Sequence, residues 1–331
     1  MVAERLTDRA RPRTALVLGA GGVLGAAWMI GALPALQQRL PYPIADVDIM
    51  LGTSAGSVVA AALRCGASIE EMVAFQRGEA LGPLAEVGDI HGNPWPRPPR
   101  LRFGSPRLMV SALVRPHRVH PTVGASAWLP VGRESHGGLR EMLDLLHARS
   151  AVAGSPCDWV ERDTWIVAVD YDSGRRVVFG RDGAPPARLP DAVVASCSIP
   201  GWYAPAVIGG RRYVDGGVRS PTSLGLLARS GVSEVCVLAP MASVVTDHPR
   251  EPHKRLERRM RAFITRTLLR EVRALRAHGV KVTLVTPGPQ DLAVMGLNPM
   301  DPRRRAAVLE TSLQTSPQTL AAAHSARPSA A

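Results

Sequence analysis

The sequence predicts an α/β fold in which a mainly parallel sheet is covered by helices. Short apolar segments typical of buried strands recur, and the first two each lead through a glycine turn into a helical segment. The first strand is expected at Ala15–Leu18, before a helix at Val23–Arg39. The second is expected at Val47–Leu51, before a helix of small residues at about Ala55–Cys65. Successive strand–turn–helix units are typical of parallel sheets, because the helix returns the chain to the end where the next strand begins.

A long irregular stretch then interrupts the pattern. From about residue 82 to 138, prolines, arginines and isolated large apolar residues show no sustained periodicity, which indicates an insertion or lid. The remaining expected helices are Ile69–Arg77, Leu139–Ala148, Pro190–Cys197 and Arg255–His278, and the remaining expected strands are Trp165–Val169, Arg176–Phe179, Arg212–Val214, Glu234–Leu238 and Val280–Val285.

The boundaries of the domain follow from these segments. Residues 1–12 form an N-terminal arm, residues 13–300 form one domain that includes the insertion, and residues 301–314 form a C-terminal helix. Residues 315–331 are rich in Ser, Ala, Pro and Gln, so we expect a disordered tail.

Charge gives a first indication of partners. The 331 residues include 40 Lys+Arg and 28 Asp+Glu, a net charge of +12, and Lys254 and Lys281 are the only lysines. A positive field favours a phospholipid surface, a nucleic acid or an acidic substrate, without choosing among them. No recognised nucleic-acid motif accompanies the charge, so we do not expect nucleic acid to be the partner.

The cysteines exclude two further classes of protein. Cys65, Cys157, Cys197 and Cys236 are widely scattered and form no Cys-x-x-Cys pair. This spacing argues against a disulfide scaffold or a zinc site and fits a reducing cytoplasm. The sequence also has no calcium-loop pattern or cluster of metal ligands, so we expect no metal or other cofactor. We expect a cytoplasmic protein, with possible peripheral contact at the membrane.

Residues 14–36 have two interpretations. They carry no charge and follow a basic stretch, so a signal peptide or membrane anchor is one alternative. However, Gly19, Gly21 and Gly22 crowd into this segment, and each glycine costs a helix roughly 1 kcal/mol relative to alanine. A buried strand, a glycine turn and a buried helix fit the segment better.

The segment Gly52-Thr53-Ser54-Ala55-Gly56 is a candidate nucleophile elbow. A G-x-S-x-G pattern between an apolar strand and a helix exposes the serine hydroxyl in a tight turn, and the glycines let strand and helix cross closely. The N-terminal amides of the following helix favour negative charge that develops beside Ser54. The alternative is a serine that only caps the helix.

A nucleophilic serine needs a base, and two kinds of candidate follow it. His248, His253 and His278 occur later in the chain, but their charged surroundings favour solvated surface histidines. Asp215 lies in Arg-Tyr-Val-Asp-Gly-Gly, after a strand end, and a carboxylate in a dry cleft can accept the serine proton. The alternative for Asp215 is a simple Asp-Gly turn.

The segment Leu18-Gly19-Ala20-Gly21-Gly22-Val23-Leu24-Gly25 is a candidate anion site. Its glycines expose backbone N–H groups where a helix begins. It could bind the pyrophosphate of a dinucleotide, but Leu24 occupies the third glycine position of G-x-G-x-x-G. It could instead form an oxyanion hole, which the elbow downstream favours, because both loops follow strands at the same end of the sheet.

Together these three motifs resemble the patatin-like phospholipase family, which combines a glycine-rich oxyanion loop, a G-x-S-x-G elbow and a distant Asp-Gly-Gly or Asp-Gly-Ala. The segment Ala195-Ser196-Cys197-Ser198-Ile199-Pro200-Gly201, which precedes Asp215-Gly216-Gly217, is also similar. The likeness extends from about residue 13 to 240, more weakly to about 300, and excludes most of 82–138.

The resemblance implies a three-layer α/β/α hydrolase with a Ser–Asp dyad and no catalytic histidine. It assigns Ser54 as the nucleophile and Asp215 as the general base. The further residues that it implies are Gly21, Gly22 and Val23, whose amides hold the oxyanion, and Gly52 and Gly56, which shape the elbow.

The glycine loop departs from the family pattern Gly-x-Gly-x-Arg/Lys-Gly at two positions. Ala20 replaces the first glycine and Leu24 replaces the basic residue. The backbone donors can survive both changes. Without the cation of the loop, the resemblance implies either weak activity or charge assistance from a different arginine.

The leading hypothesis is a serine lipid acyl hydrolase of the phospholipase A or lysophospholipase type, acting on lipid or phospholipid esters. The alternatives are a catalytically weak or inactive lipid-binding protein of the same fold and, less favoured, a dinucleotide-binding oxidoreductase.

Aromatic and basic residues alternate in the insertion. This composition suits an anionic lipid interface, where aromatic rings lie among the headgroups. The alternative is a solvated loop with its aromatic residues packed inward. The residues concerned are Trp95, Phe103 and Trp128, with Arg97, Arg100, Arg102, Arg107, Arg115 and Arg118.

Overall fold

The computed structural model describes residues 12–325, except residues 80, 83, 85–86, 88–89, 91–94, 151–157, 246 and 248. Most of the N-terminal arm, Cys157, His248 and the end of the expected tail therefore lie outside the described residues.

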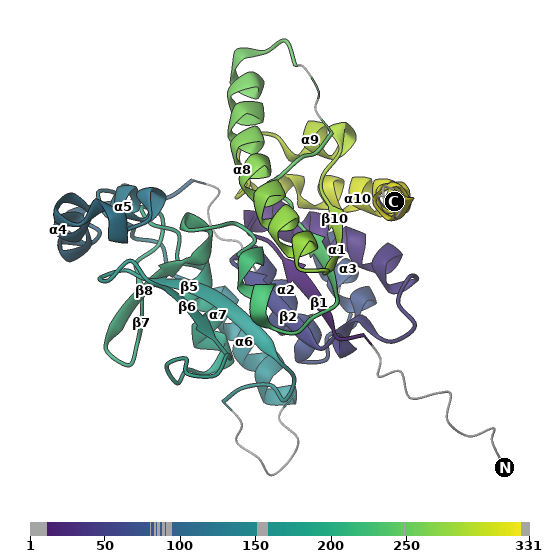
Figure 1. The fold of residues 1–331 in the computed structure, drawn as a ribbon, viewed down its shortest axis with the longest axis horizontal. Helices are drawn as coiled ribbons and strands as arrows, with labels where there is room; N and C mark the ends of the chain where they lie inside the picture. Colours follow the sequence, from purple (N-terminus) through teal and green to yellow (C-terminus); the bar gives the residue numbers. More distant parts are fainter. Residues whose placement is uncertain are drawn as a thin grey trace.

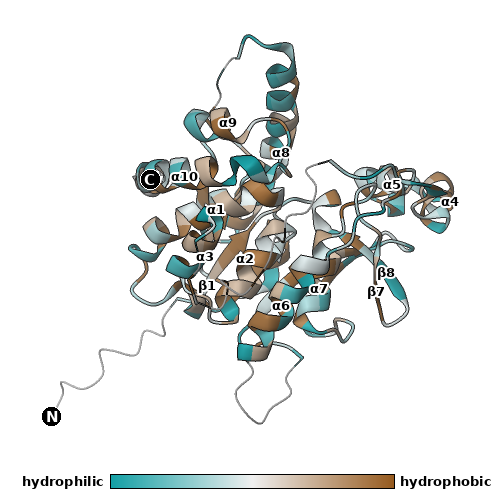
Figure 2. Ribbon diagram, turned by 180° about the vertical axis from the view of Figure 1, so that it is seen from behind, coloured by the Kyte–Doolittle hydropathy of each residue, from teal (hydrophilic) through white to brown (hydrophobic). Residues whose placement is uncertain are grey.

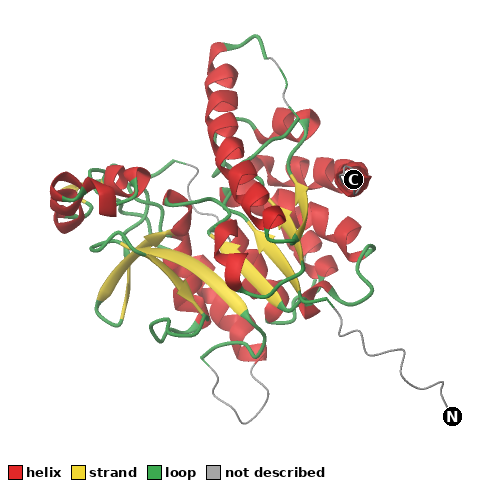
Figure 3. Ribbon diagram, in the orientation of Figure 1, coloured by secondary structure: helices red, strands yellow, loops and turns green. Residues whose placement is uncertain are grey.

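A mixed eight-stranded sheet forms the centre of the molecule (Figures 1 and 3). Its order is β10-β9-β1-β2-β5-β8-β7, and β6 pairs with β5. The run from β10 to β5 is parallel, whereas β6 and β8 are antiparallel to β5. The strands are β1 (Thr14–Leu18), β2 (Ile49–Thr53), β5 (Thr164–Asp170), β6 (Arg176–Phe179), β7 (Ala206–Ile208), β8 (Arg211–Asp215), β9 (Glu234–Leu238) and β10 (Lys281–Val285).

Helices cover both faces of this sheet and bury two separate apolar clusters. The expectation of three α/β/α layers is confirmed, and Figure 2 shows hydrophobic residues concentrated in the strands and the inner helices. On one face lie α1 (Gly22–Gln37), α2 (Ala55–Arg64), α3 (Ile69–Arg77), α6 (Gly137–Ser150), α7 (Leu189–Cys197), α9 (Pro289–Met295) and α10 (Arg305–Ser325), and on the other lie α8 (Pro252–Ala277) and the short helix Leu224–Arg229.

The uncharged segment 14–36 is β1, a glycine turn and α1 rather than a membrane anchor. Helix α1 is buried on almost all sides, because it packs against α2, α3 and α10 as well as the sheet. A helix surrounded in this way is apolar all round without any membrane. Within the described ranges, no helix combines the length and the apolar character needed to cross a bilayer.

The expectation of a disordered tail from residue 315 is wrong as far as Ser325, where α10 ends. Small side chains in this helix allow a close approach to α1. The Ser312 hydroxyl donates to the Trp28 carbonyl at 2.7 Å, and a Cβ at Gly31 would lie 2.7 Å from the Ser312 Cβ. Composition alone does not distinguish such a packed face from a disordered segment.

The insertion is more regular than we expected. It contains a two-stranded pair, β3 (Arg100–Phe103) with β4 (Pro130–Val131), and two short helices, α4 (Pro106–Val114) and α5 (Pro121–Ser126). The two helices and the residues next to them share a small apolar cluster with Val169, Tyr171 and Val214 of the main sheet and its loops. Helices this short carry too few turns for a periodic pattern to stand out in the sequence.

Candidate active site

Ser54 lies in a strained turn between β2 and α2. Its backbone has φ 53° and ψ −124°, and Ser54 and Ser223 are the non-glycine residues with positive φ in the described part of the chain. An L-residue rarely adopts this conformation, and strain of this kind concentrates at functional sites. It is the geometry of a strand-to-helix elbow that presents a nucleophile.

Glycines on both sides of Ser54 are required by close backbone contacts. A Cβ at Gly52 would lie 2.5 Å from the Ser57 Cα, and a Cβ at Gly56 would lie 1.9 Å from the Leu18 carbonyl oxygen. No side chain fits at either position, so α2 can cross β1 and β2 only with glycine there.

The pairing of β5 explains why Ser54 and Asp215 meet. Residues 166–169 of β5 pair with β6 on one side, so β2 and β8 share the other side. There Thr53 pairs with Val167, and Asp215 pairs with the next residue, Ala168. Since β2 and β8 run in opposite directions, their last residues meet end to end, and Ser54 leaves the sheet beside Asp215.

The side chains of Ser54 and Asp215 are both buried, with 4% and 5% of their surfaces exposed. Burial raises the pKa of the Asp215 carboxyl from 3.8 to about 6, although hydrogen bonds from the Ser54 side chain and the Gly217 N–H oppose this change. The Gly217 N–H donates to Asp215 Oδ1 at 2.6 Å. A carboxylate with a raised pKa is a better proton acceptor than a solvated one.

Ser196 holds the elbow in place, a role that the sequence did not reveal. Its hydroxyl accepts a hydrogen bond from the Ser54 N–H at 2.8 Å and donates to the Val167 carbonyl at 2.6 Å. It therefore links the nucleophile turn to β5. The segment 195–201 is similar to a family motif, but nothing in its local pattern indicates this bridge.

The glycine-rich loop lies directly beside these residues. The Leu24 N–H donates to the Pro299 carbonyl at 3.0 Å. Within the described residues no acceptor is found for the N–H groups of Gly21, Gly22 and Val23, which lie at the start of α1. Unpaired N–H groups at a helix N-terminus attract negative charge.

Leu24 is buried in the core, with 1% of its surface exposed, so residue 24 contributes no side chain to the site. The loop contacts the Asp215 turn instead, because a Cβ at Gly217 would lie 3.2 Å from the Ala20 Cβ. The three sequence motifs thus come together at the carboxyl ends of β1 and β2.

A cavity opens beside Ser54. It is lined by Gly22 and Val23 of the glycine loop and by apolar residues of α1, α2, α3 and α6, and its empty space, open mouth included, is about 1060 Å³. An apolar cavity of this kind accommodates a hydrocarbon chain. Among the described residues, no group of three or more His, Cys, Asp or Glu side chains is arranged to hold a metal ion.

His136 lines the same cavity and was not singled out from the sequence. Its ring stacks on Tyr203 at 3.9 Å, and burial lowers its pKa to about 4, so it is neutral at pH 7. His253 on α8 and His278, which caps the end of α8, are exposed as expected and do not line this cavity.

Cys197 is the other group close to Ser54. Burial raises the pKa of its thiol, and the nearby Asp215 charge acts in the same direction, so the thiol stays protonated. Because the thiolate is the reactive form, this cysteine is a packing residue rather than a competing nucleophile.

Comparison with solved structures finds several chains with partial similarity to this one. The structure of VipD from Legionella pneumophila aligns with a TM-score of 0.42 and 14% identity, covering 94% of this chain and 67% of that one. The type III effector ExoU aligns with a TM-score of 0.35 and 16% identity, covering 94% and 53%. The ExoU–SpcU complex of the Pseudomonas aeruginosa type III secretion system gives 0.31 and 19%, covering 95% and 60%. The chain thus spans 53% to 67% of the length of these structures.

Sequence comparison with family models gives the assignment. The model of the patatin-like phospholipases matches residues 16–228, which include the glycine loop, Ser54 and Asp215. This is more than half of the chain, and it confirms the resemblance found in the three motifs. The chain belongs to the patatin-like phospholipase family of lipid ester hydrolases.

Proposed function

We propose that this protein is a serine lipid acyl hydrolase of the phospholipase A or lysophospholipase type, with Ser54 as nucleophile and Asp215 as general base. The observation that carries the proposal is that the buried Ser54 and Asp215 meet where β2 and β8 end, at an elbow of strained geometry. The raised pKa of Asp215 supports its role, because a base is most effective when its pKa lies near the working pH.

In the proposed reaction the Ser54 Oγ attacks the ester carbonyl while Asp215 accepts the hydroxyl proton. The tetrahedral oxyanion is held by the N–H groups of Gly21, Gly22 and Val23, and losing one such donor costs roughly 3–4 kcal/mol. Asp215 returns the proton to the leaving alcohol, which leaves an acyl group on Ser54. Water then attacks this ester while Asp215 takes its proton. The bond between the acyl carbon and the Ser54 Oγ breaks, Asp215 returns the proton to the Oγ, and the fatty acid leaves.

The cavity supports a lipid as the substrate. Its lining beside Ser54 is mostly apolar, so an acyl chain can leave water there while its ester lies at the nucleophile. The neutral ring of His136 and the apolar body of Tyr203 belong to the same wall.

The insertion supports peripheral contact with an anionic membrane. Phe103 and Trp128 contact each other edge to face and are about half exposed, and Val110, Leu113 and Val114 of α4 are more exposed still. Exposed arginines surround them. The alternative of inward-packed aromatic residues is therefore wrong for Phe103 and Trp128. The insertion also adjoins the site, because the Thr122 hydroxyl donates to the Val218 carbonyl, three residues after Asp215.

The proposal is tested by fatty acid release from phospholipid vesicles. The wild type is expected to release fatty acid, and Ser54→Ala to lose at least about a thousandfold of that rate. Ser135→Ala is the matched control, since Ser135 lines the same cavity but is exposed and outside the elbow. Equal rates in the wild type and Ser54→Ala would overturn the proposal.

Two other outcomes correspond to the alternatives. Vesicle binding without release, even from activated p-nitrophenyl esters, would indicate a lipid-binding protein that has lost turnover. Tight NAD(P) binding in a titration would favour an oxidoreductase. The unpaired glycine-loop amides and the elbow beside them favour hydrolysis over both.

A further inference from the structure

Helix α8 exposes an apolar stripe that the proposed reaction does not use. Leu256, Met260 and Phe263 are 60–61% exposed. Their spacing of four and three residues places them on one face of the helix. The opposite face, with Thr265, Leu268 and other buried residues, packs on the sheet. An exposed apolar stripe of this kind on a surface helix indicates an interaction site.

The same half of α8 extends past the catalytic end of the sheet. Thr265 is bonded to Ser243, which lies beyond the end of β9, so the residues before Thr265 project further outward. Figures 1 and 3 show this half of the helix standing away from the body. Because β9 is parallel to β1 and β1 to β2, this is also the end at which Ser54 lies.

The outward side of α8 is strongly basic. Arg255, Arg259, Arg266 and Arg270 are exposed and form no ion pair with any described residue. Figure 2 shows this part of the helix as predominantly hydrophilic. Glu251, at the cap of α8, is occupied by Lys254.

The acidic residues within α8 are turned toward the body. Glu271 is bonded to Ser220 and Thr222, and Glu257 to Arg258 and Arg261. The accessible face therefore combines apolar and cationic groups with little opposing charge. A helix with this composition is typical of binding in the interface of an anionic membrane.

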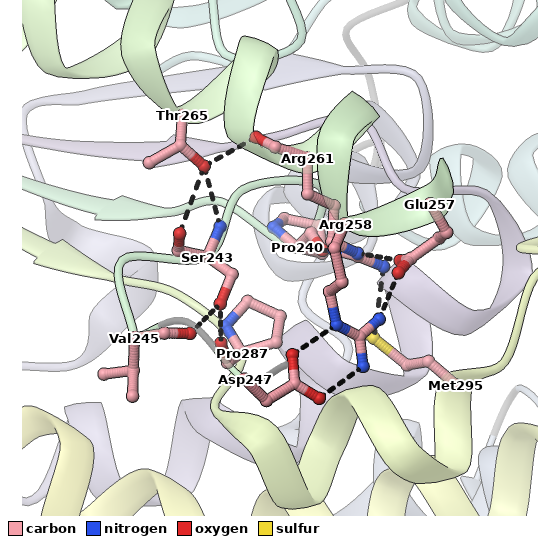
Figure 4. Close-up of polar contacts among 10 residues, drawn as sticks. All are labelled: Pro240, Ser243, Val245, Asp247, Glu257, Arg258, Arg261, Thr265, Pro287 and Met295. Carbon is pink, nitrogen blue, oxygen red and sulfur yellow. Dashed lines mark hydrogen bonds and ion pairs between the residues drawn. The ribbon is translucent and has the colours of Figure 1, made fainter. Parts of the chain in front are cut away.

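A polar network fixes the projecting half of α8 to Pro240, Ser243 and Asp247 in the loop that follows β9 (Figure 4). Arg258 pairs with Asp247 at 2.5 Å, and Arg261 donates to the Pro240 carbonyl at 2.6 Å. Pro240 in turn packs on the glycine loop, since a Cβ at Gly21 would lie 2.7 Å from its Cγ. Whatever binds to the exposed face of α8 is therefore held close to the N–H groups of the glycine loop.

We infer that the outward face of α8, formed by Leu256, Met260, Phe263 and the neighbouring arginines, docks on an anionic lipid bilayer. The apolar side chains enter the headgroup region, and the arginines contact lipid phosphates. The inference deepens the proposed function, because it names a surface that holds the Ser54 end of the sheet against the membrane. It is separate from the insertion, which lies on the other side of that end.

Sedimentation with vesicles tests this inference in Ser54→Ala protein, where hydrolysis cannot alter the lipids. Replacing Leu256, Met260 and Phe263 together by serine is expected to weaken binding to phosphatidylserine-containing vesicles at least about tenfold. Val207→Ser, an exposed apolar residue on β7, is the control and is expected to bind normally. Thermal melting checks that the variants remain folded.

The charge is tested in the same way. Replacing Arg259, Arg266 and Arg270 together by glutamine is expected to weaken binding at least about tenfold, because each basic residue near an anionic surface contributes to the attraction. The control replaces Arg162, Arg181 and Arg188, which lie off α8, and is expected to bind as before. The Ser54→Ala protein with an unaltered α8 is expected to bind more weakly at high salt, and also more weakly to vesicles of pure phosphatidylcholine.

Three results would overturn the inference. The first is undiminished vesicle binding by the α8 serine variant, and the second is equal binding to neutral and anionic vesicles. The third is capture by heparin or nucleic acid that depends on the arginines while vesicle binding does not, which would assign α8 to an acidic macromolecule. Failure of the hydrolase proposal would appear separately, as vesicle binding through α8 with no fatty acid release by the wild type.

Discussion

Burial and hydrogen bonding act in opposite directions on Asp215. Burial raises the pKa of its carboxyl to about 6, while Ser54 and the Gly217 N–H favour the ionised form. An ionised Asp215 is therefore costly to the folded state, although the proposed reaction requires it. Functional groups often reduce stability in this way, because a buried charge that the reaction needs costs free energy in the folded state.

This conflict predicts how Asp215→Asn changes stability with pH. The unfolded carboxyl loses its proton near pH 3.8 and the folded one near pH 6, so wild-type stability falls as pH rises between these values. Asparagine does not titrate and keeps an acceptor for the Gly217 N–H. Relative to the wild type, the free energy of unfolding of Asp215→Asn is therefore expected to be up to about 3 kcal/mol more favourable at pH 8 than at low pH. Urea unfolding at several pH values measures this, and a pH-independent difference would contradict it.

At the residue scale the sequence revealed the reacting groups but not their supports. Ser54 and Asp215 lie in glycine-rich motifs that can be recognised locally. Ser196 and His136 are single residues without such a motif, and only folding brings them to the elbow and the cavity. A short sequence pattern can identify a turn, whereas a contact between residues far apart in the sequence becomes visible only in the folded structure.

At the scale of elements, close crossing of helix and strand defines the elbow. Helix α2 passes so near β1 that Gly56 contacts the Leu18 carbonyl. The order of β1, α1, β2 and α2 was predictable, because each strand is a short apolar run that ends at a glycine turn. The end-to-end meeting of β2 and β8 along β5 was not, because it depends on an antiparallel pairing between distant segments.

Gly56→Ala tests this crossing. A Cβ there would lie 1.9 Å from a backbone oxygen, so the helix must shift, and we expect a loss of at least about 2 kcal/mol in the free energy of unfolding. Gly137→Ala is the matched control, since no atom lies within 4 Å of its Cβ position and Gly137 begins a helix. Denaturant unfolding compares them, and equal stability of the two variants would contradict this account of the elbow.

At the scale of the whole molecule, helices from both ends of the chain pack together on one face of the sheet. Helix α10, near the C-terminus, covers α1, near the N-terminus, and buries Val308, Leu309 and Leu320. The sequence predicted the layers but not this closure, since the small polar residues of α10 are also typical of disordered tails. The small Ser312 side chain lets α10 pack closely against Gly31 of α1.

Removing residues 305–331 is expected to destabilise the entire domain rather than trim a tail. Three buried leucine and valine side chains stabilise by roughly 5 kcal/mol or more in total, and their loss also exposes α1. Cooperative thermal unfolding is therefore expected to disappear. A chain that lacks only residues 326–331 is the control and is expected to melt as the full chain does. A truncated domain that melts normally would show that α10 is dispensable.

The most direct test of the central claim is the rate at which a fluorophosphonate probe labels the protein as a function of pH, with the labelled peptide identified by mass spectrometry. We predict that the probe labels Ser54 and that the labelling rate rises as Asp215 ionises through about pH 6. Ser54→Ala is expected to abolish labelling, and Asp215→Asn to slow it at least about a hundredfold. An adduct on another residue, or a labelling rate unchanged by Asp215→Asn, would contradict the assignment of this pair.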